Sequence, residues 1–328
     1  MSIMMLKKQR VVLLSVFFLI FSLLVSCSKK DSSRRADLKG RTDLTVLFTS
    51  GLHGKIRSCG CAVIDMGGLG RMATYVKRTK RKTDNLIFLS CGDDFSLDLS
   101  FSMDKADLLM ECYELMGLDV FTTGEIEYIF GLDYLIDIDE LFSFDFVVSN
   151  LVYSENRERV FKPAYLIKEL DTGLRVGITG LLDDSVRFPD YIDRSKFRLE
   201  PAVDTLKAVA ERMKDEADLL IVLSHMELDA TRRVLSEVPL FDIAVTGHGS
   251  QRIDKIERVG ETLLLGVGGD GKYIGKLDLE ISRKGEIEYS SVKLVPLEKN
   301  IPIHNGVKRV FRSHGIELTD KEDSKKSY

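Results

Sequence analysis

The sequence lacks several features that would point directly to a function class. It has no excess of basic charge, with 47 lysines and arginines against 51 aspartates and glutamates among 328 residues. A nucleic-acid-binding domain normally carries a cationic patch, so we expect no nucleic-acid partner. There are also no internal repeats and no low-complexity blocks. The 44% of hydrophobic residues is enough to bury a full core in one large domain or two smaller ones.

The chain also lacks an apolar run long enough for a comfortable membrane span. The run from residue 11 to residue 25 is too short, and it ends in Ser26 and Cys27. It follows a positively charged segment made of Lys7, Lys8 and Arg10. This arrangement resembles a bacterial lipoprotein signal, in which the cysteine is lipidated and becomes the first residue.

The resemblance predicts the organisation of the N-terminal region and its location. We expect residues 1–26 to be a signal peptide and residues 27–42 to be a flexible polar tether. Cys27 would be anchored in a membrane of the cell envelope, facing outside the cytoplasm, and in the outer membrane if the organism has one. An uncleaved N-terminal anchor helix is the alternative and gives the same topology.

From residue 43 onward, strand-like and helix-like stretches alternate. Apolar residues at helical spacing occur in residues 67–81, 104–116, 131–142, 201–214 and 230–237. This alternation predicts an α/β layer structure whose functional loops leave the carboxyl ends of the strands. We expect one domain over residues 43–300, followed by a C-terminal helix and a polar tail over residues 301–328.

The last third changes to short strand-like runs separated by glycines. They cover residues 253–259, 261–267, 272–281 and 285–295. This pattern predicts an antiparallel sheet with tight turns. We expect that sheet to pack as a second sheet on the first.

Five apolar runs each end in a polar signature. They are TVLFTSGLHG (45–54), LIFLSCGDD (86–94), DVFTTGEIE (119–127), DLLIVLSHME (218–227) and FDIAVTGHGS (241–250). Histidine and carboxylate are the usual ligands of divalent zinc, manganese or iron. Three of the five histidines of the chain lie in these loops. The predicted metal ligands are His53, Asp93, Glu125, His225 and His248.

The five loops, in this order, resemble the motifs of the calcineurin-like metallophosphoesterases. The surrounding sequence, including GGLGRMATYVKR and RVGITGLL, is similar to the 5′-nucleotidase branch. The resemblance covers roughly residues 44–295 and does not extend to a C-terminal nucleotide-specificity domain. It implies a four-layer α/β sandwich of two packed mixed sheets flanked by helices. It also implies a divalent metal cofactor and a small phosphoester substrate, such as a nucleotide.

Several positions depart from the pattern of this family. Gly51 stands where the first loop has an aspartate, and Ser250 where the last loop has a second histidine. Ile126 replaces the histidine thought to act on the leaving group, and Glu125 replaces a ligand asparagine. We therefore assign no catalytic residue. Removal of a positioned acid or base typically costs ~10²-fold to 10⁴-fold in rate, so weak activity is expected.

The departures affect the two metal positions of the family unequally. One retains four ligands, namely Asp93, Glu125, His225 and His248. The other retains only His53 and the shared Asp93, fewer than the three to four protein ligands that a stable site uses. The sequence thus predicts one metal site and a second that is empty or rebuilt.

Three cysteines lie close in sequence to two of the predicted ligands, His53 and Asp93. Cys59 and Cys61 follow His53, and Cys91 lies two residues before Asp93. They could form a disulfide in an exported compartment, with Cys59 or Cys61 paired to Cys91, or supply thiolate ligands to a softer metal. Cys112 lies on the apolar face of a predicted helix and is interpreted as a core residue.

Three functions remain open at the level of the sequence. The first is a lipid-anchored, metal-dependent phosphoester hydrolase with an altered dinuclear site. The second is a non-catalytic envelope lipoprotein that uses the fold as a binding or scaffold module for a protein partner. The third is a thiol- or metal-handling protein that uses the Cys-Gly-Cys loop at residues 59–61.

Overall fold

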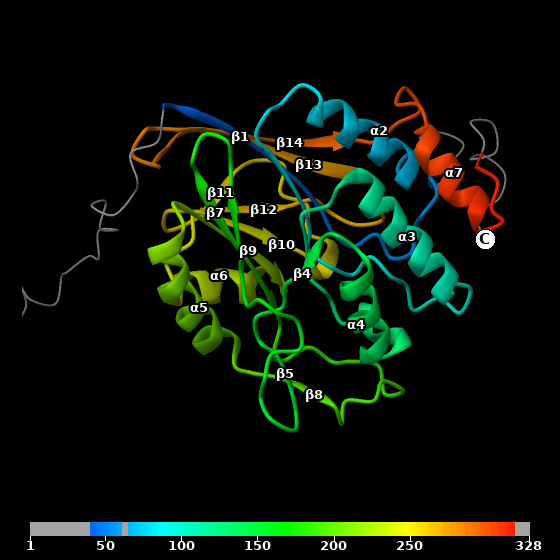
Figure 1. Cartoon of the computed structure of the whole chain (residues 1–328), viewed down its shortest axis with the longest axis horizontal. Coiled ribbons are helices and arrows are strands. Elements are labelled where there is room, and N and C mark those ends of the chain that lie inside the picture. Colours follow the sequence, from blue (N-terminus) through cyan, green and yellow to red (C-terminus); the bar gives the residue numbers. More distant parts are fainter. Residues whose placement is uncertain (1–39, 61–64, 319–328) are drawn as a thin grey trace, which may run out of the picture. The chain divides into compact units, whose positions relative to one another are not determined.

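The computed structural model describes residues 40–60 and 65–318 (Figure 1). The predicted signal peptide, Cys27, most of the tether, Cys61 and most of the polar tail lie outside these residues. Among the described residues, no helix has the length and apolar character needed to cross a bilayer.

Two six-stranded sheets form the centre of the domain. In the first sheet the order is β14 (Ile287–Pro296), β13 (Tyr273–Ile281), β1 (Thr42–Thr49), β2 (Leu86–Ser90), β3 (Val120–Phe121) and β4 (Asp145–Phe146). In the second sheet the order is β11 (Glu257–Val259), β12 (Thr262–Gly266), β10 (Ile243–Thr246), β9 (Leu219–His225), β7 (Arg175–Leu182) and β6 (Leu166–Glu169). Strands β5 (Leu151–Tyr153) and β8 (Phe197–Leu199) form a separate pair.

Each sheet has a parallel centre and antiparallel edges. Strands β1, β2, β3 and β4 are parallel to one another, as are β7, β9, β10 and β12 in the other sheet. Strands β13, β14, β6 and β11 are added antiparallel at the edges. The carboxyl ends of the parallel strands therefore gather at one end of each sheet, where the five signature loops begin.

The two sheets pack face to face, and each buries both of its faces. In β1, Val46 and Phe48 face the second sheet, whereas Leu47 faces helices. In β9, Ile221 likewise lies between the sheets and Val222 faces helices. Because alternate residues of a strand point to opposite faces, burial of both faces explains why these strands read as continuous apolar runs.

Helices cover the outer face of each sheet (Figure 1). The first sheet is covered by α2 (Leu69–Lys80), α3 (Met103–Met116), α4 (Leu132–Leu141) and α7 (Asn305–Ser313). The second is covered by α5 (Ala202–Glu216) and α6 (Leu228–Glu237). Short 3₁₀ helices, η2 (Ile126–Phe130) and η3 (His248–Ser250), follow β3 and β10. The predicted four-layer α/β sandwich is confirmed, and so are the helices predicted from the spacing of apolar residues.

The prediction of a separate antiparallel sheet in the last third was wrong. Strands β11 and β12 join the second sheet, and β12 pairs parallel with β10. Strands β13 and β14 join the first sheet beside β1. The glycine cluster at residues 268–271 is therefore a crossover between sheets. Strand pairing is decided by long-range packing, which the local pattern of turns does not encode.

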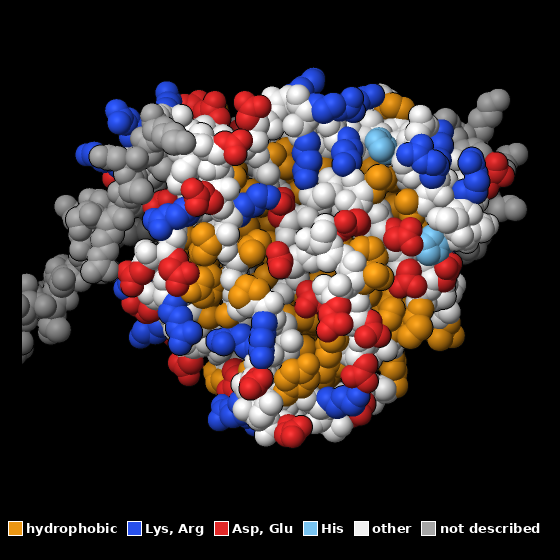
Figure 2. All heavy atoms as spheres, viewed as in Figure 1, with side chains coloured by type: hydrophobic (Ala, Val, Ile, Leu, Met, Phe, Trp, Pro, Cys, Tyr) orange, Lys and Arg blue, Asp and Glu red, His pale blue; other side chains and the backbone are white. Residues whose placement is uncertain are grey.

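The surface over α2 and α7 is cationic (Figure 2). Neither helix contains an acidic residue, and α2 ends in Lys77, Arg78 and Lys80. Cations in the last turn of a helix are favoured by the helix dipole. This surface lies on the helix layer outside the first sheet.

Candidate metal centre

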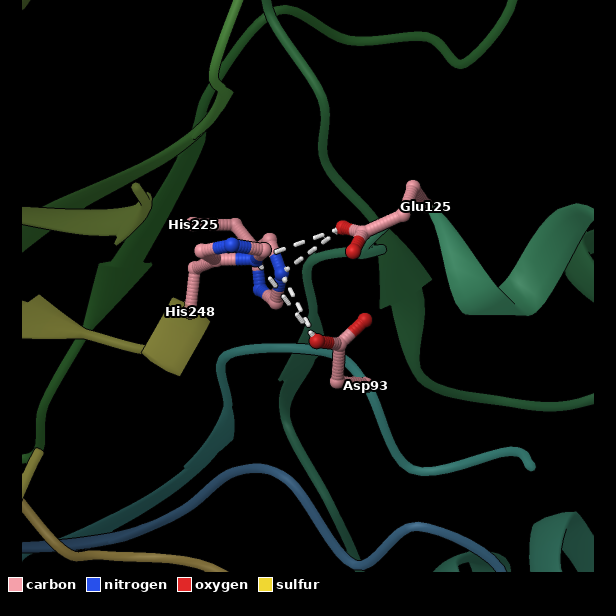
Figure 3. Close-up of side chains that lie close together, drawn as sticks. All are labelled: Asp93, Glu125, His225 and His248. Atoms are coloured by element: carbon pink, nitrogen blue, oxygen red, sulfur yellow. Dashed lines mark ion pairs between the residues drawn. The ribbon is translucent and has the colours of Figure 1, made fainter. Parts of the chain in front are cut away.

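Four of the predicted ligands converge at the carboxyl ends of four strands (Figure 3). Asp93 follows β2 and Glu125 follows β3, both in the first sheet. His225 is the last residue of β9 and His248 begins η3 directly after β10, both in the second sheet. The cluster therefore lies where the two sheets meet, with the carboxylates on one side and the imidazoles on the other (Figure 3).

The separations within the cluster suit a single divalent ion. His225 Nε2 lies 3.3 Å from Asp93 Oδ2 and 3.4 Å from Glu125 Oε2. His248 Nδ1 lies 3.4 Å from Glu125 Oε2 and 3.8 Å from Asp93 Oδ2. Tetrahedral ligands at about 2.1 Å from a zinc ion lie about 3.4 Å from one another. The four side chains thus surround a space of the right size.

The polar atoms around this space have no hydrogen-bond partners. Asp93 Oδ1, Glu125 Oε2, His225 Nε2 and His248 Nδ1 are all buried and form no hydrogen bond, although the imidazoles lie within ion-pair distance of the carboxylates. Buried polar atoms normally have a hydrogen-bond partner. Four such atoms without one, all in the same cluster, point to a bound ion as their partner. A Cβ at Gly124 would stand 2.1 Å from Asp93 Oδ1 and 2.6 Å from His225 Nε2. The chain therefore needs glycine there to keep the space open.

The tautomer of His225 is fixed by its other nitrogen. Nδ1 lies 2.6 Å from the backbone oxygen of Cys91. A carbonyl oxygen only accepts, so Nδ1 carries the hydrogen and Nε2 presents its lone pair to the centre. His225 is completely buried, which leaves its ring no alternative orientation. These are the features of a preorganised ligand.

Opposite charges within the cluster shift its pKa values strongly. Burial alone would raise the pKa of Glu125, but His225 and His248 outweigh it and lower that pKa well below its usual value. Burial alone would lower the pKa of His225, yet Asp93 and Glu125 raise it well above 6.5. The two carboxylates thus favour protonation of the histidines, and a metal ion would compete with protons for the same ring nitrogens.

Glu127 holds the backbone under this cluster, a role that was not predicted from the sequence. Its carboxylate accepts hydrogen bonds from four backbone N–H groups, those of Asp93, Asp94, Phe95 and Gly124, at 2.7–3.0 Å. Glu127 thereby ties the loop after β2 to the loop after β3. The signal was its fixed place in GEIE, two residues after a predicted ligand.

Asp94 performs a similar task for the first loop. It accepts hydrogen bonds from the backbone N–H of Leu52 at 3.0 Å and from the Tyr113 hydroxyl at 2.6 Å. Burial raises the pKa of Asp94 to about 6. The second acidic residue of CGDD is therefore a support for the loop that carries His53, not a ligand.

The fifth predicted ligand, His53, lies outside the cluster of four. Its Nδ1 is 3.3 Å from Asp270 Oδ1, and Asp270 also pairs with Lys272 at 2.8 Å. A Cβ built at Gly51 would lie 3.5 Å from His53 Nε2 and 3.6 Å from Ser250 Oγ. The positions of the two missing family ligands thus adjoin His53, and no carboxylate or imidazole is supplied from them. Asp270 was not foreseen, because it comes from the crossover that was predicted as a hairpin.

Ile126 and the cysteines have other environments. Ile126 is half-buried and packs against the apolar core beneath the helices. Cys91 is a buried free thiol whose Sγ donates to the backbone oxygen of Val245 at 3.3 Å, and burial raises its pKa. It forms no disulfide and is not in the ligand cluster. Cys59 Sγ accepts a hydrogen bond from the backbone N–H of Met66 at 3.5 Å, and Cys61 lies outside the described residues.

Known proteins share both the sequence and the fold. The 5′-nucleotidase of Vibrio cholerae is 24% identical over 318 residues, which cover 86% of this chain and 56% of that protein. The structure of the 5′-nucleotidase precursor from Thermus thermophilus superposes with a TM-score of 0.72 at 19% identity, covering 84% of this chain and 58% of that one. The calcineurin-like phosphoesterase YfkN from Bacillus subtilis superposes with a TM-score of 0.67 at 18% identity, covering 84% and 97%.

The 5′-nucleotidase-like metallophosphoesterases are therefore the family that the chain resembles in both sequence and fold. No family model matches it. The chain spans between about a fifth and a half of the length of the first curated relatives it matches. This family depends on divalent metal, and the cluster of Asp93, Glu125, His225 and His248 is a group that could hold such an ion. Which metal binds, and whether these four residues are its ligands, stay predictions.

Proposed function

We propose that this metallophosphoesterase-like chain hydrolyses phosphoesters of the nucleotide kind with one divalent metal ion, and that its activity is weak. The observation that supports the proposal is the group of four ligand atoms, one each from Asp93, Glu125, His225 and His248, that lie within 4.8 Å of one another. An ion bound there would act as a Lewis acid on the phosphoryl group and supply the nucleophile at neutral pH.

The chain's own residues prepare this chemistry. His225 is oriented as a ligand by the backbone oxygen of Cys91, and Glu127 holds the loops of Asp93 and Gly124 in place. Glu125 adds a negative charge at the position where the motif of the family that the chain resembles has a neutral asparagine. Ile126 supplies no proton to the leaving group, which is the reason for the expected low rate.

The proposal extends to location. We propose that residues 1–26 are removed and that Cys27 is lipidated, so that the domain is held at a membrane outside the cytoplasm. The support is the order of a basic segment, an apolar run and Ser26-Cys27. Metabolic labelling with a fatty acid, compared between the natural chain and Cys27→Ser, tests this. Equal labelling of both chains would refute it.

The proposed activity is tested by measuring both the bound metal and the release of phosphate. The full chain is purified, loaded with zinc, manganese or iron, and assayed on a generic phosphomonoester, a phosphodiester and nucleoside monophosphates. We expect one ion per chain and slow phosphate release that Asp93→Ala abolishes. Release unchanged by Asp93→Ala would refute the proposal.

A non-catalytic binding role is the second candidate, and Ile126 favours it. A bound ion in the natural chain without any turnover would support this alternative. A thiol function has no support at Cys91, because its thiol is buried and donates a hydrogen bond inside the protein.

A further inference from the structure

A cleft of about 660 Å³ opens beside the metal centre. Four parts of the chain line it: residues 54–59 after His53, three residues between Asp93 and the first turns of α3 (Asp98, Ser100 and Lys105), residues 270 and 272 of the crossover, and Ile316. Ligand pockets typically have volumes of ~300–1,000 Å³. The cleft is therefore large enough for a substrate of nucleotide size.

Contacts connect this cleft to the metal centre. Asp270 lines the cleft and lies 3.3 Å from His53 Nδ1. A Cβ at Gly269 would lie 2.4 Å from Ser250 Oγ, and Ser250 closes the 3₁₀ helix that His248 begins. The backbone N–H of His53 donates to the oxygen of Asp93 at 3.0 Å. The cleft thus adjoins the side of the centre that has lost family ligands.

The charge of the cleft is mainly positive. Its lining includes four cations, Lys55, Arg57, Lys105 and Lys272, and two carboxylates, Asp98 and Asp270. Asp270 neutralises Lys272 at 2.8 Å.

The remaining three cations are available to a ligand. In the described part of the chain, Lys55, Arg57 and Lys105 form no ion pair, and Arg57 and Lys105 donate only to the backbone oxygens of Glu317 and Ser100. Lysine and arginine presented in this way favour an anion, because each hydrogen bond to it is charge-assisted.

We propose that this cleft binds a second anionic group of the substrate, on the side of the leaving group. The proposal rests on the proposed hydrolase function and names its substrate class. Preferred substrates carry a further phosphate on the alcohol that leaves, as in nucleoside bisphosphates, and nucleoside monophosphates with an uncharged leaving group are poorer. Lys55, Arg57 and Lys105 provide the N–H donors for that phosphate.

The first test compares two substrates on the full metal-loaded chain. Phosphate release is measured from adenosine 3′,5′-bisphosphate and from adenosine 5′-monophosphate. The quantity compared is kcat/KM for the bisphosphate divided by kcat/KM for the monophosphate. We expect Lys55→Gln or Lys105→Gln to lower this ratio by about tenfold, the usual effect of losing one charge-assisted hydrogen bond.

Lys82→Gln is the matched control. Lys82 is exposed and precedes β2, at the strand end opposite Asp93, so the ratio should stay unchanged. A ratio that neither cleft variant changes would overturn the proposal.

The second test separates the cleft from catalysis. Binding of adenosine 3′,5′-bisphosphate to the Asp93→Asn chain is measured by calorimetry at two salt concentrations. We expect binding that weakens with salt and falls about tenfold on Lys55→Gln. If the natural chain releases no phosphate but the binding depends on salt and on Lys55 in this way, the hydrolase proposal fails and the proposal that the cleft binds an anionic group is retained. Absence of binding together with normal turnover of the monophosphate overturns the cleft alone.

Discussion

The two sides of the metal centre are built from the same kind of loop, yet they present different groups. On one side, Asp93, Glu125, His225 and His248 each offer one ligand atom, and these atoms lie within 4.8 Å of one another. On the other, Gly51 and Ser250 supply no ligand, and His53 contacts Asp270 instead. The loop of Gly51 and His53 nevertheless keeps its hydrogen bonds to the loop of Asp93 and Asp94. The comparison shows that this fold maintains its loops without requiring a ligand from each of them.

The largest effect should come from a ligand on the first side. His225→Ala removes a completely buried ligand. Because even a residue that only orients a ligand is worth roughly 10-fold to 100-fold, we expect turnover to fall by more than about 100-fold and metal content to fall to near zero. Turnover and metal content are measured on the same preparation. Retention of the metal would show that the ion binds elsewhere.

The next largest effect should be on the stability of the loop that follows His53, on the second side of the centre. Arg71 and Asp65 form a buried ion pair beneath the loop that follows His53. Breaking a buried pair from one side costs about 3–5 kcal/mol, so we expect Asp65→Asn to lower the free energy of unfolding by about 3 kcal/mol. Chemical denaturation of the two chains checks this. A change below about 0.5 kcal/mol would show that the pair is dispensable.

The same pair predicts a pH dependence. Burial alone would raise the pKa of Asp65, but hydrogen bonds from Arg71 and from the backbone N–H of Gly60 help to outweigh it, so the folded pKa lies below 3.8. A depressed carboxyl pKa stabilises the fold above the ordinary value and loses that contribution as the pH falls through the folded value. The difference in stability between the natural chain and Asp65→Asn should therefore shrink below pH 3.8.

A gain-of-ligand variant can make the two sides alike. Gly51 has φ +61°, which aspartate tolerates better than most residues, and a Cβ there meets its nearest neighbour at 3.4 Å, an ordinary contact. We expect Gly51→Asp combined with Ser250→His to raise the bound metal from one ion to two. Turnover should rise roughly tenfold, within the several kcal/mol that a bound cation supplies. Elemental analysis measures the stoichiometry, with Gly51→Asp alone as the control.

The smallest effect should come from His53. It lies outside the cluster, so His53→Ala should change turnover by about twofold or less, comparable to the ±0.5 kcal/mol of a surface substitution. Metal content should not change. A loss near that of His225→Ala would show that His53 is a ligand and that both sides bind metal.

The fold and most of the candidate site could be predicted from the sequence because both leave local patterns along the chain. A strand buried on both faces and followed at once by His or Asp leaves a strong local signal, as in β9 and His225. Residues that act through tertiary contacts leave at most a weak signal, such as the place of Glu127 two residues after a predicted ligand. Asp270 reaches His53 only because β13 crosses to pair with β1, and Glu127 acts through amides of another loop. Neither arrangement follows from spacing along the chain.

The four amide hydrogen bonds of Glu127 have a consequence for how the protein matures. They fix the backbone of Asp93 and Gly124 without help from any ion. The positions of Asp93 and Gly124 are therefore set when the chain folds. We expect such a protein to reach its final shape first and to take up metal later, from whatever supply it meets, without refolding. Its metal would then reflect the surroundings in which the folded protein resides.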